Sequence, residues 1–222
     1  MKRFAAVAAD FDGTLVSGTP HPSEEVLRVL EEARKRVKLI LVTGRVISTV
    51  DKNLLAKFDA VVAENGALVE TSGRRYAFFP DKEWGRLCSV LEKRIADPTA
   101  EVGEVILSFD RSVTSEVEHA LSSEGLESIA RLEFNRDRVM VLPRGVDKGF
   151  GLSRVCEAMA IDPREVACIG DAENDLPLFE VAGFCAAVAN ALPELKARAD
   201  YVCQNPNGRG VVEFFQRFVL KQ

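Results

Sequence analysis

Short, mainly apolar runs that end at polar residues constrain the fold of this chain more than any other feature. Residues 4–9 form a continuous apolar run of mostly small and β-branched side chains, and residues 37–42 and 166–169 form two further runs that are apolar except for Lys38. They are typical of strands buried on both faces, as in a parallel sheet. Apolar residues recur at helical spacing in the segments between them, for example in 23–36 and 46–57. The sequence therefore predicts an α/β fold with a parallel-sheet core.

The middle of the chain breaks this alternation of strand and helix. Its pattern predicts a helix, a strand, a helix and a hairpin, at residues 81–96, 105–109, 114–124, 132–134 and 139–142. Such an order is typical of a small α+β unit. We therefore expect a core domain made of residues 1–79 and 145–222, interrupted by an inserted α+β cap domain at residues 80–144.

Composition limits the partners of the protein. The chain has 222 residues and a net charge of −5, with no run of like charge. An acidic protein without a basic patch is poorly suited to nucleic acid or an anionic membrane, so we predict neither as a partner. The five cysteines are odd in number and form no Cys-x-x-Cys pair, which favours reduced thiols and a cytoplasmic location. We expect a monomer or a homodimer.

Polar residues that could take part in catalysis or metal binding follow the predicted strands. They are Asp10 and Asp12 after the first run, Thr43 after the second, Asp171 and Asp175 after a later one, and Lys148 at the start of a helix. Because ligands bind beyond the carboxyl ends of strands in an open parallel sheet, we expect these side chains to converge.

Charge repulsion indicates what this cluster would hold. Carboxylates close together repel, so a cation must bind between them, and aspartate oxygens near a phosphate favour Mg²⁺. With the metal and Lys148 neutralising a phosphate, one carboxylate can act as nucleophile and another as general acid and base. Thr43 and backbone N–H groups of the turn at residues 10–14 can hold the phosphoryl oxygens.

These residues resemble the four ordered motifs of the haloacid-dehalogenase superfamily, in its phosphatase branch. The motifs are Asp10-Phe-Asp-Gly-Thr-Leu15, Thr43-Gly-Arg45, Lys148 and Gly170-Asp-Ala-Glu-Asn-Asp175. Glu64-Asn-Gly-Ala67 resembles a further signature of the Cof-like, type IIB branch, whose cap lies between the second and third motifs. The short length and small cap are most similar to the archaeal phosphoglycolate phosphatases.

The resemblance implies a Rossmann-like core and Mg²⁺-dependent hydrolysis of small phosphate monoesters through an aspartyl-phosphate. It implies a small phosphorylated metabolite as the partner, with 2-phosphoglycolate as the substrate, giving glycolate and phosphate. The roles it implies are nucleophile for Asp10, general acid and base for Asp12, metal binding for Asp10, Asp12, Asp171 and Asp175, and phosphate binding for Thr43, Gly44, Lys148 and Asn174.

Several alternatives remain open at this point. Sugar phosphates could be the substrates, a phosphomannomutase-like phosphotransferase could share the motifs, and a phosphorylated signalling receiver gathers similar groups. Arg45 could reach the substrate or the cap, or form a surface ion pair, and Asn65 and Gly66 could form only a turn. An arginine could bind a substrate carboxylate bidentately or be solvated, and the candidates are Arg111, Arg136, Arg138 and Arg144.

Overall fold

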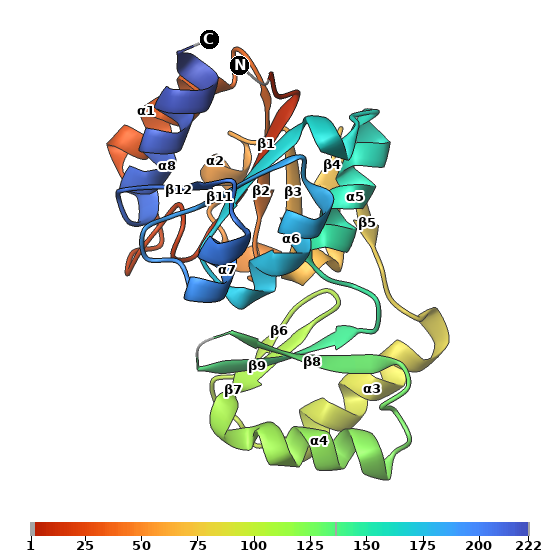
Figure 1. Ribbon diagram of the computed structural model, residues 1–222. Helices are drawn as coiled ribbons and strands as arrows, with labels where there is room; N and C mark the ends of the chain where they lie inside the picture. The colour runs from red at the N-terminus through yellow and green to blue at the C-terminus, as the bar shows by residue number, and fades with distance from the viewer. Residues whose placement is uncertain (1–2, 136, 222) are drawn as a thin grey trace.

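Two β-sheets organise the chain. The computed structural model describes residues 3–135 and 137–221. Figure 1 shows the two sheets one above the other, with two stretches of chain connecting them. The larger sheet has the strand order β12-β11-β10-β1-β2-β3-β4-β5, and the smaller has the order β6-β7-β9-β8.

The larger sheet is parallel from β12 to β3, and β4 and β5 extend it antiparallel. Its strands are β1 (Ala6–Asp10), β2 (Lys38–Val42), β3 (Ala60–Ala63), β4 (Leu68–Thr71), β5 (Arg74–Ala77), β10 (Val166–Gly170), β11 (Phe184–Ala187) and β12 (Tyr201–Val202). All five residues of β1 are buried, as its apolar run predicts for a central strand. The predicted α/β fold with a parallel-sheet core is therefore confirmed.

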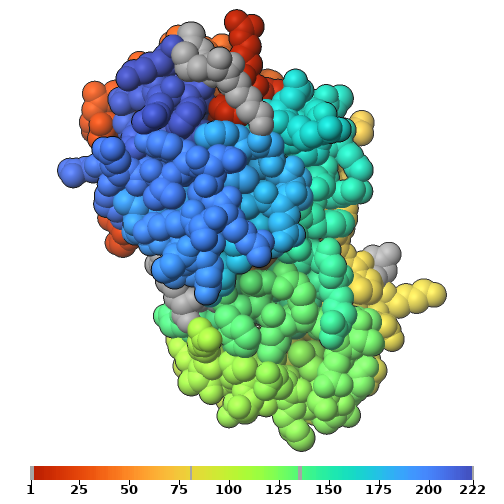
Figure 2. All heavy atoms as spheres, in the orientation of Figure 1, coloured from red at the N-terminus to blue at the C-terminus, as the bar shows by residue number. Residues whose placement is uncertain are grey.

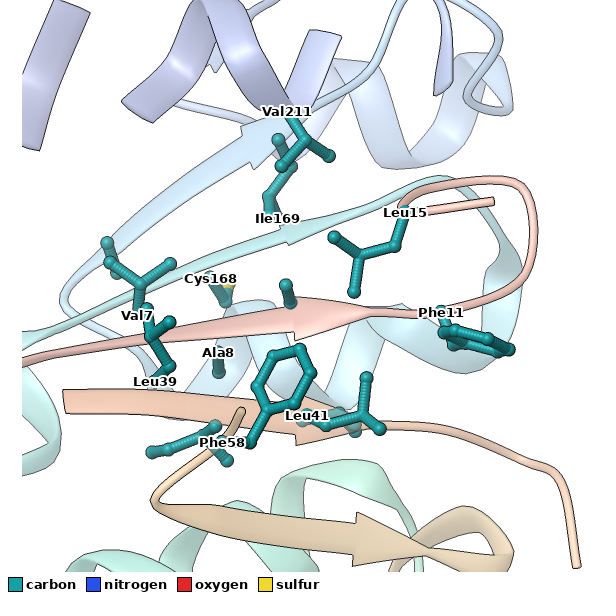
Figure 3. Close-up of a cluster of buried hydrophobic side chains, with 14 of the residues drawn as sticks. Val7, Ala8, Phe11, Leu15, Leu39, Leu41, Phe58, Cys168, Ile169 and Val211 are labelled. Atoms are coloured by element: carbon teal, nitrogen blue, oxygen red, sulfur yellow. The ribbon is translucent and has the colours of Figure 1, made fainter. Parts of the chain in front are cut away.

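Helices cover both faces of this sheet. They are α1 (Glu24–Ala33), α2 (Lys52–Leu55), α5 (Lys148–Met159), α6 (Leu176–Val181), α7 (Pro193–Arg198) and α8 (Asn207–Phe215). Figure 1 shows α1 and α8 on one side of the sheet and α5 on the other. Figure 3 shows Val211 of α8 beside Ile169 of β10, within a cluster that also contains Val7 and Leu39. Burial of this apolar surface is the main force that holds the layers together.

The smaller sheet is antiparallel and lies between β5 and α5 in the sequence. Its strands are β6 (Glu101–Val102), β7 (Leu107–Asp110), β8 (Ala130–Asn135) and β9 (Arg138–Pro143), and its helices are α3 (Asp81–Arg94) and α4 (Thr114–Ser123). We call the segment from α3 to β9 the insert, and the other described residues the core. Figure 1 shows α3 and α4 on the face of this sheet that points away from the core.

A second apolar cluster lies mostly in the insert and includes Val46, Ala67 and Val146 of the core. One face of α3 carries Trp84, Leu87 and Leu91, and Ile95 directly follows the helix. All four side chains are buried. The indole Nε1–H of Trp84 also donates to the carbonyl of Val105 at 2.7 Å. These apolar side chains, including Trp84, therefore serve the packing of the insert. The division into core and cap domains at residues 80–144 stays a prediction.

One predicted element is wrong in its extent. Residues 46–57 do not form one helix but a 3₁₀ turn at Ile47–Thr49 and the short α2. Val50 between them is extended. Asp51 accepts hydrogen bonds from the backbone N–H groups of Asn53 and Leu54, at 2.7 and 3.1 Å, and so begins a new helix. A side chain that caps a helix start here outweighs the apolar periodicity.

Candidate active site

The predicted site residues lie where β1, β2 and β10 end side by side. β1 pairs in parallel with both neighbours, with Asp10 opposite Val42 and Ala9 opposite Ile169. Asp10 is the last residue of β1, Thr43 follows β2, and Asp171 follows β10. The register of three strands thus brings segments far apart in the sequence to one edge of the sheet.

Lys148 is buried between two carboxylates. Its Nζ lies 2.7 Å from Asp10 Oδ1 and 2.6 Å from Asp175 Oδ1. Asp147 caps the start of α5 by accepting from the N–H of Phe150 at 2.7 Å, which fixes the helix turn that carries Lys148. Burial alone would lower the pKa of Lys148, but the two carboxylates outweigh it and hold that pKa above its ordinary value. The ammonium group is therefore a fixed positive charge within the site.

One oxygen of Asp10 is left for a ligand. Asp10 Oδ2 is buried and has no hydrogen-bond partner among residues 3–135 and 137–221. Burial, helped by the charges of Asp175 and Asp171, raises the pKa of Asp10 against the influence of Lys148. An unpaired buried carboxylate oxygen is costly, so such an atom usually serves a ligand or a cation.

The carboxylates are placed to share a metal ion. Asp10, Asp171 and Asp175 are buried, and each offers an oxygen within 4.8 Å of the others. The donors are all carboxylate oxygens, as a hard cation such as Mg²⁺ prefers. Together with the unpaired oxygen of Asp10, this donor set fits a divalent ion.

Asp171 and Asp175 differ in what already holds them. Thr14 Oγ1 donates to Asp171 Oδ1 at 3.1 Å. Asp175 Oδ2 accepts from the N–H groups of Asp171 and Ala172 at 2.9 and 3.1 Å, while its Oδ1 binds Lys148. Because both oxygens of Asp175 are engaged, its geometry favours positioning Lys148 and the loop over direct coordination.

Asp12 is not part of this buried cluster and pairs with Arg45. Arg45 Nε donates to Asp12 Oδ2 and its Nη2 to Asp12 Oδ1, both at 2.7 Å. These bonds raise the pKa of Arg45, whose guanidinium also lies 5.0 Å from the centre of the Phe11 ring. The two side chains are 31% and 33% exposed, so a substrate can reach both. The sequence left the role of Arg45 open, and its partner is the predicted general acid.

The other candidate phosphate ligands are joined through Asn65. Thr43 is buried and its Oγ1 accepts from the N–H of Arg45 at 3.1 Å. Asn174 Nδ2 donates to Asn65 Oδ1 at 3.2 Å. Gly44 packs so closely that an added Cβ would lie 2.9 Å from the same oxygen. Asn65, left open as a turn residue by the sequence, thus holds together the loops that follow β2 and β10.

A cavity of about 390 Å³ opens beside Asp12 and Arg45. The core lines it with Asp12, Gly44, Arg45 and Thr49, and the insert with Glu101, Ser108, Asp137, Arg138 and Met140. Figure 2 shows the green atoms of the insert packed against the blue and teal atoms of the core. A molecule bound at the strand ends would therefore extend toward side chains of the insert.

Of the arginines in or beside the insert, Arg138 lines the cavity but is held by the insert itself. It donates to Ser108 Oγ, the Ser108 carbonyl, Thr99 Oγ1 and the Thr99 carbonyl, at 2.6–3.0 Å. Arg111 lies over the Phe134 ring and Arg144 Nε donates to the Glu127 carbonyl. The prediction for Arg136 lies outside the described residues.

No helix among residues 3–135 and 137–221 combines the length and apolarity that crossing a membrane requires. The family model described as haloacid dehalogenase-like hydrolase matches residues 7–79 and 80–215.

Named relatives and solved structures agree with that match. The chain is 35% identical to "Phosphoglycolate phosphatase 2" of Saccharolobus solfataricus, over 96% of this chain and 91% of the relative. A crystal structure of Thermoplasma acidophilum 0175 has a TM-score of 0.79 at 23% identity and covers 97% and 98% of the two chains. A subclass IIB sugar phosphatase has a TM-score of 0.73 at 21% identity, covering 96% and 98%. The chain therefore belongs to the haloacid dehalogenase-like hydrolases, as its ordered motifs predicted, and is an enzyme of that family's phosphatase class.

Proposed function

We propose that the protein hydrolyses small phosphate monoesters with Mg²⁺ through an aspartyl-phosphate on Asp10, and that 2-phosphoglycolate is its main substrate. The observation that carries the chemistry is the buried carboxylate of Asp10, with one oxygen 2.7 Å from Lys148 and the other unpaired. The relatives named phosphoglycolate phosphatase support the substrate. The five free cysteines agree with a reducing cytoplasm.

The residues of the site can carry out both the formation and the hydrolysis of the aspartyl-phosphate. Asp10 and Asp171, with the carbonyl of Asp12, would hold Mg²⁺, which supplies positive charge to the phosphoryl oxygens. Asp10 attacks phosphorus while the bond to the leaving oxygen breaks, and Asp12 donates a proton to that oxygen. Asp12 then takes a proton from water, which attacks phosphorus and releases phosphate and free Asp10. Lys148, Thr43, Gly44 and Asn174 would hold the phosphoryl group through both steps.

Arg45 is our candidate for recognising the carboxylate of glycolate. It lines the cavity on the leaving-group side, next to the acid that must protonate the leaving oxygen. Arg138, which lines the same cavity, already makes four hydrogen bonds to Ser108 and Thr99. A substrate carboxylate would compete with Asp12 for Arg45, and Asp12 would then be released to carry its proton.

A sugar-phosphate phosphatase is the second candidate. The insert places the acidic side chains of Glu101 and Asp137, together with Ser108, around the cavity. Carboxylates and hydroxyls accept hydrogen bonds from the hydroxyl groups of a sugar, whereas the acids repel a carboxylate.

Initial rates with Mg²⁺ on a panel of monoesters test the choice. The panel contains 2-phosphoglycolate, glycerol phosphate and hexose phosphates. We expect kcat/KM to be highest for 2-phosphoglycolate, and a higher value for a hexose phosphate would favour the second candidate. Hydrolysis in water labelled with oxygen-18 should place the label in the released phosphate, while transfer of phosphate to a sugar would contradict a hydrolase.

A further inference from the structure

The Glu64–Asn65–Gly66 turn carries a buried carboxylate that the proposed chemistry does not use. Glu64 directly follows β3 in the core, and its side chain is buried. Its hydrogen-bond donors nevertheless come from the insert. Glu64 Oε1 accepts from the N–H of Glu104 at 3.0 Å, and Oε2 accepts from the N–H groups of Val105 and Ile106 at 2.8 and 3.0 Å. Three backbone N–H groups on one carboxyl group make this contact a firm attachment.

The backbone on both sides of the contact is shaped to allow it. Glu64 and Asn65 have φ values of 54° and 51°, in the left-handed region that side-chain-bearing residues adopt at a cost. On the insert, a Cβ added at Gly103 would lie 2.5 Å from Glu64 Oε2, so a larger residue there would displace the carboxylate from its present position. A strained turn on one partner and a glycine on the other both serve a single carboxylate.

The attached segment carries groups that face the substrate cavity. Residues 103–106 form the turn between β6 and β7, closed by the N–H of Gly103 donating to the carbonyl of Ile106 at 2.8 Å. β6 carries Glu101 and β7 carries Ser108, both of which line the cavity opposite Asp12 and Arg45. The position of this turn therefore sets the room left for a leaving group.

The Glu64–Asn65–Gly66 turn of the core also reaches the phosphate end of the site. Asn65 Nδ2 contacts Met140 Sδ of the insert at 3.2 Å, while Asn65 Oδ1 accepts from Asn174 of the core. The turn therefore lies between the loops proposed to hold phosphate and the two strands β7 and β9 of the insert.

We propose that Glu64 is a positioning residue that clamps the β6–β7 turn to the core and thereby limits the enzyme to small leaving groups. This proposal deepens the proposed phosphatase function and rests on it. The clamp is an attachment of the insert in addition to the two covalent connections. With it in place, Glu101 and Ser108 are held close to Asp12 and Arg45. Without it, the same strands can move outward and admit a larger alcohol.

The test compares Glu64→Gln with wild type on a small and a bulky ester. The amide keeps the size of the side chain but replaces one acceptor oxygen with a donor that faces backbone N–H groups. We expect kcat/KM for 2-phosphoglycolate to fall about 10-fold, mainly through KM, while the value for glucose 6-phosphate stays constant or rises. The selectivity ratio, which is kcat/KM for 2-phosphoglycolate divided by kcat/KM for glucose 6-phosphate, should thus fall at least about 10-fold. A merely structural defect would lower kcat for both esters alike.

Hydrogen exchange supplies a second readout on the folded protein. The amides of Glu104, Val105 and Ile106 should exchange about 10-fold faster in the Gln variant, because they lose an acceptor. Glu124→Gln is the matched control, since Glu124 pairs with Arg86 and Arg94 within the insert and has no part in the clamp. It should leave the selectivity ratio and these amides unchanged.

The outcomes separate the two proposals. An unchanged selectivity ratio in Glu64→Gln overturns the clamp, as does unchanged exchange of the three amides. If wild type does not hydrolyse 2-phosphoglycolate but the Gln variant shifts selectivity toward bulky esters, the clamp stands and the proposed substrate falls.

Discussion

The proposed catalytic residues of the core differ in burial from two insert residues that line the cavity. In the core, Asp10, Lys148 and Asp175 are buried and hold one another through bonds of 2.6–2.7 Å. On the insert side, Glu101 and Asp137 are exposed. Buried groups fixed by charged partners are organised before a ligand arrives, as catalysis requires. The comparison suggests that the core performs the reaction and that the insert selects what leaves.

The two sheets also differ in how firmly they hold β1 of the core and β6 of the insert. β1 lies between β10 and β2 and is buried along its whole length, so its last residue is fixed by neighbours on both sides. β6 lies at the edge of the smaller sheet, and both of its residues are exposed. An edge strand can shift with little loss of packing, whereas a central one cannot. This difference explains why a separate clamp on the β6–β7 turn is needed.

The largest effect should follow from changing the proposed nucleophile in the core. Asp10→Asn keeps the shape of the side chain but removes its negative charge, so we expect kcat to fall by on the order of 10⁴ or more. Steady-state rates with 2-phosphoglycolate measure this loss. Glu118→Gln, an exposed change in α4 of the insert, is the control and should keep the wild-type rate. Near-normal turnover of Asp10→Asn would remove the nucleophile from the core and break the comparison.

A smaller but still large effect is expected for Asp171→Asn. Removing one proposed metal ligand should raise the Mg²⁺ concentration needed for half-maximal rate by about 100-fold. Mg²⁺ at 100 times its Kd should stabilise the wild type by about 2.7 kcal/mol, which thermal unfolding detects, while the variant at the same concentration gains far less. The exposed Asp162→Asn is the matched control. An identical magnesium titration for both variants would exclude Asp171 as a ligand.

Arg45→Met tests the boundary between the two regions, because Arg45 belongs to the core but faces the leaving group. We expect kcat/KM for 2-phosphoglycolate to fall by about 10–100-fold, since a charged hydrogen bond to the carboxylate is lost. Glycerol phosphate has no carboxylate and should lose much less. Arg45→Lys keeps the charge without the bidentate geometry and should fall in between. Equal losses for both esters would mean that Arg45 acts only on Asp12.

The core was predictable from sequence because its signals are local. Each apolar run predicts a buried strand, and each run ends in a polar residue at the same edge of the sheet. Asp10, Thr43 and Asp171 could therefore be brought together without coordinates. Residues 46–57 show where local reasoning fails, since the apolar spacing predicted one helix and the cap at Asp51 divides it.

Contacts between segments far apart in the sequence could not be predicted in the same way. Glu64 is separated by 40–42 residues from the N–H groups that it accepts from, and Arg45 by 33 from Asp12. The Glu64 contact depends on how the insert is oriented on the core, and the Arg45–Asp12 pair depends on how the segments after β1 and β2 fold toward each other within the core. The Glu64-Asn-Gly-Ala67 signature pointed to the turn but not to what its carboxylate holds.

The smallest effect concerns the stability of the insert relative to the core, and thiol labelling can measure it. Cys88 lies in α3 of the insert and is half-buried, whereas the other four cysteines lie in the core and are buried. Burial raises the pKa of Cys88 to about 11 and that of Cys203 to about 12, so few thiolates exist at pH 8 and labelling should be slow throughout. The small sheet of the insert should open more readily than the large sheet of the core. Cys88 should therefore be labelled first, at a rate at most about 10-fold above that of the other thiols. Cys88→Ser should remove that first phase. Simultaneous labelling of all five thiols would show that core and insert unfold as one unit, and the difference between them would then lie only in the cavity surface.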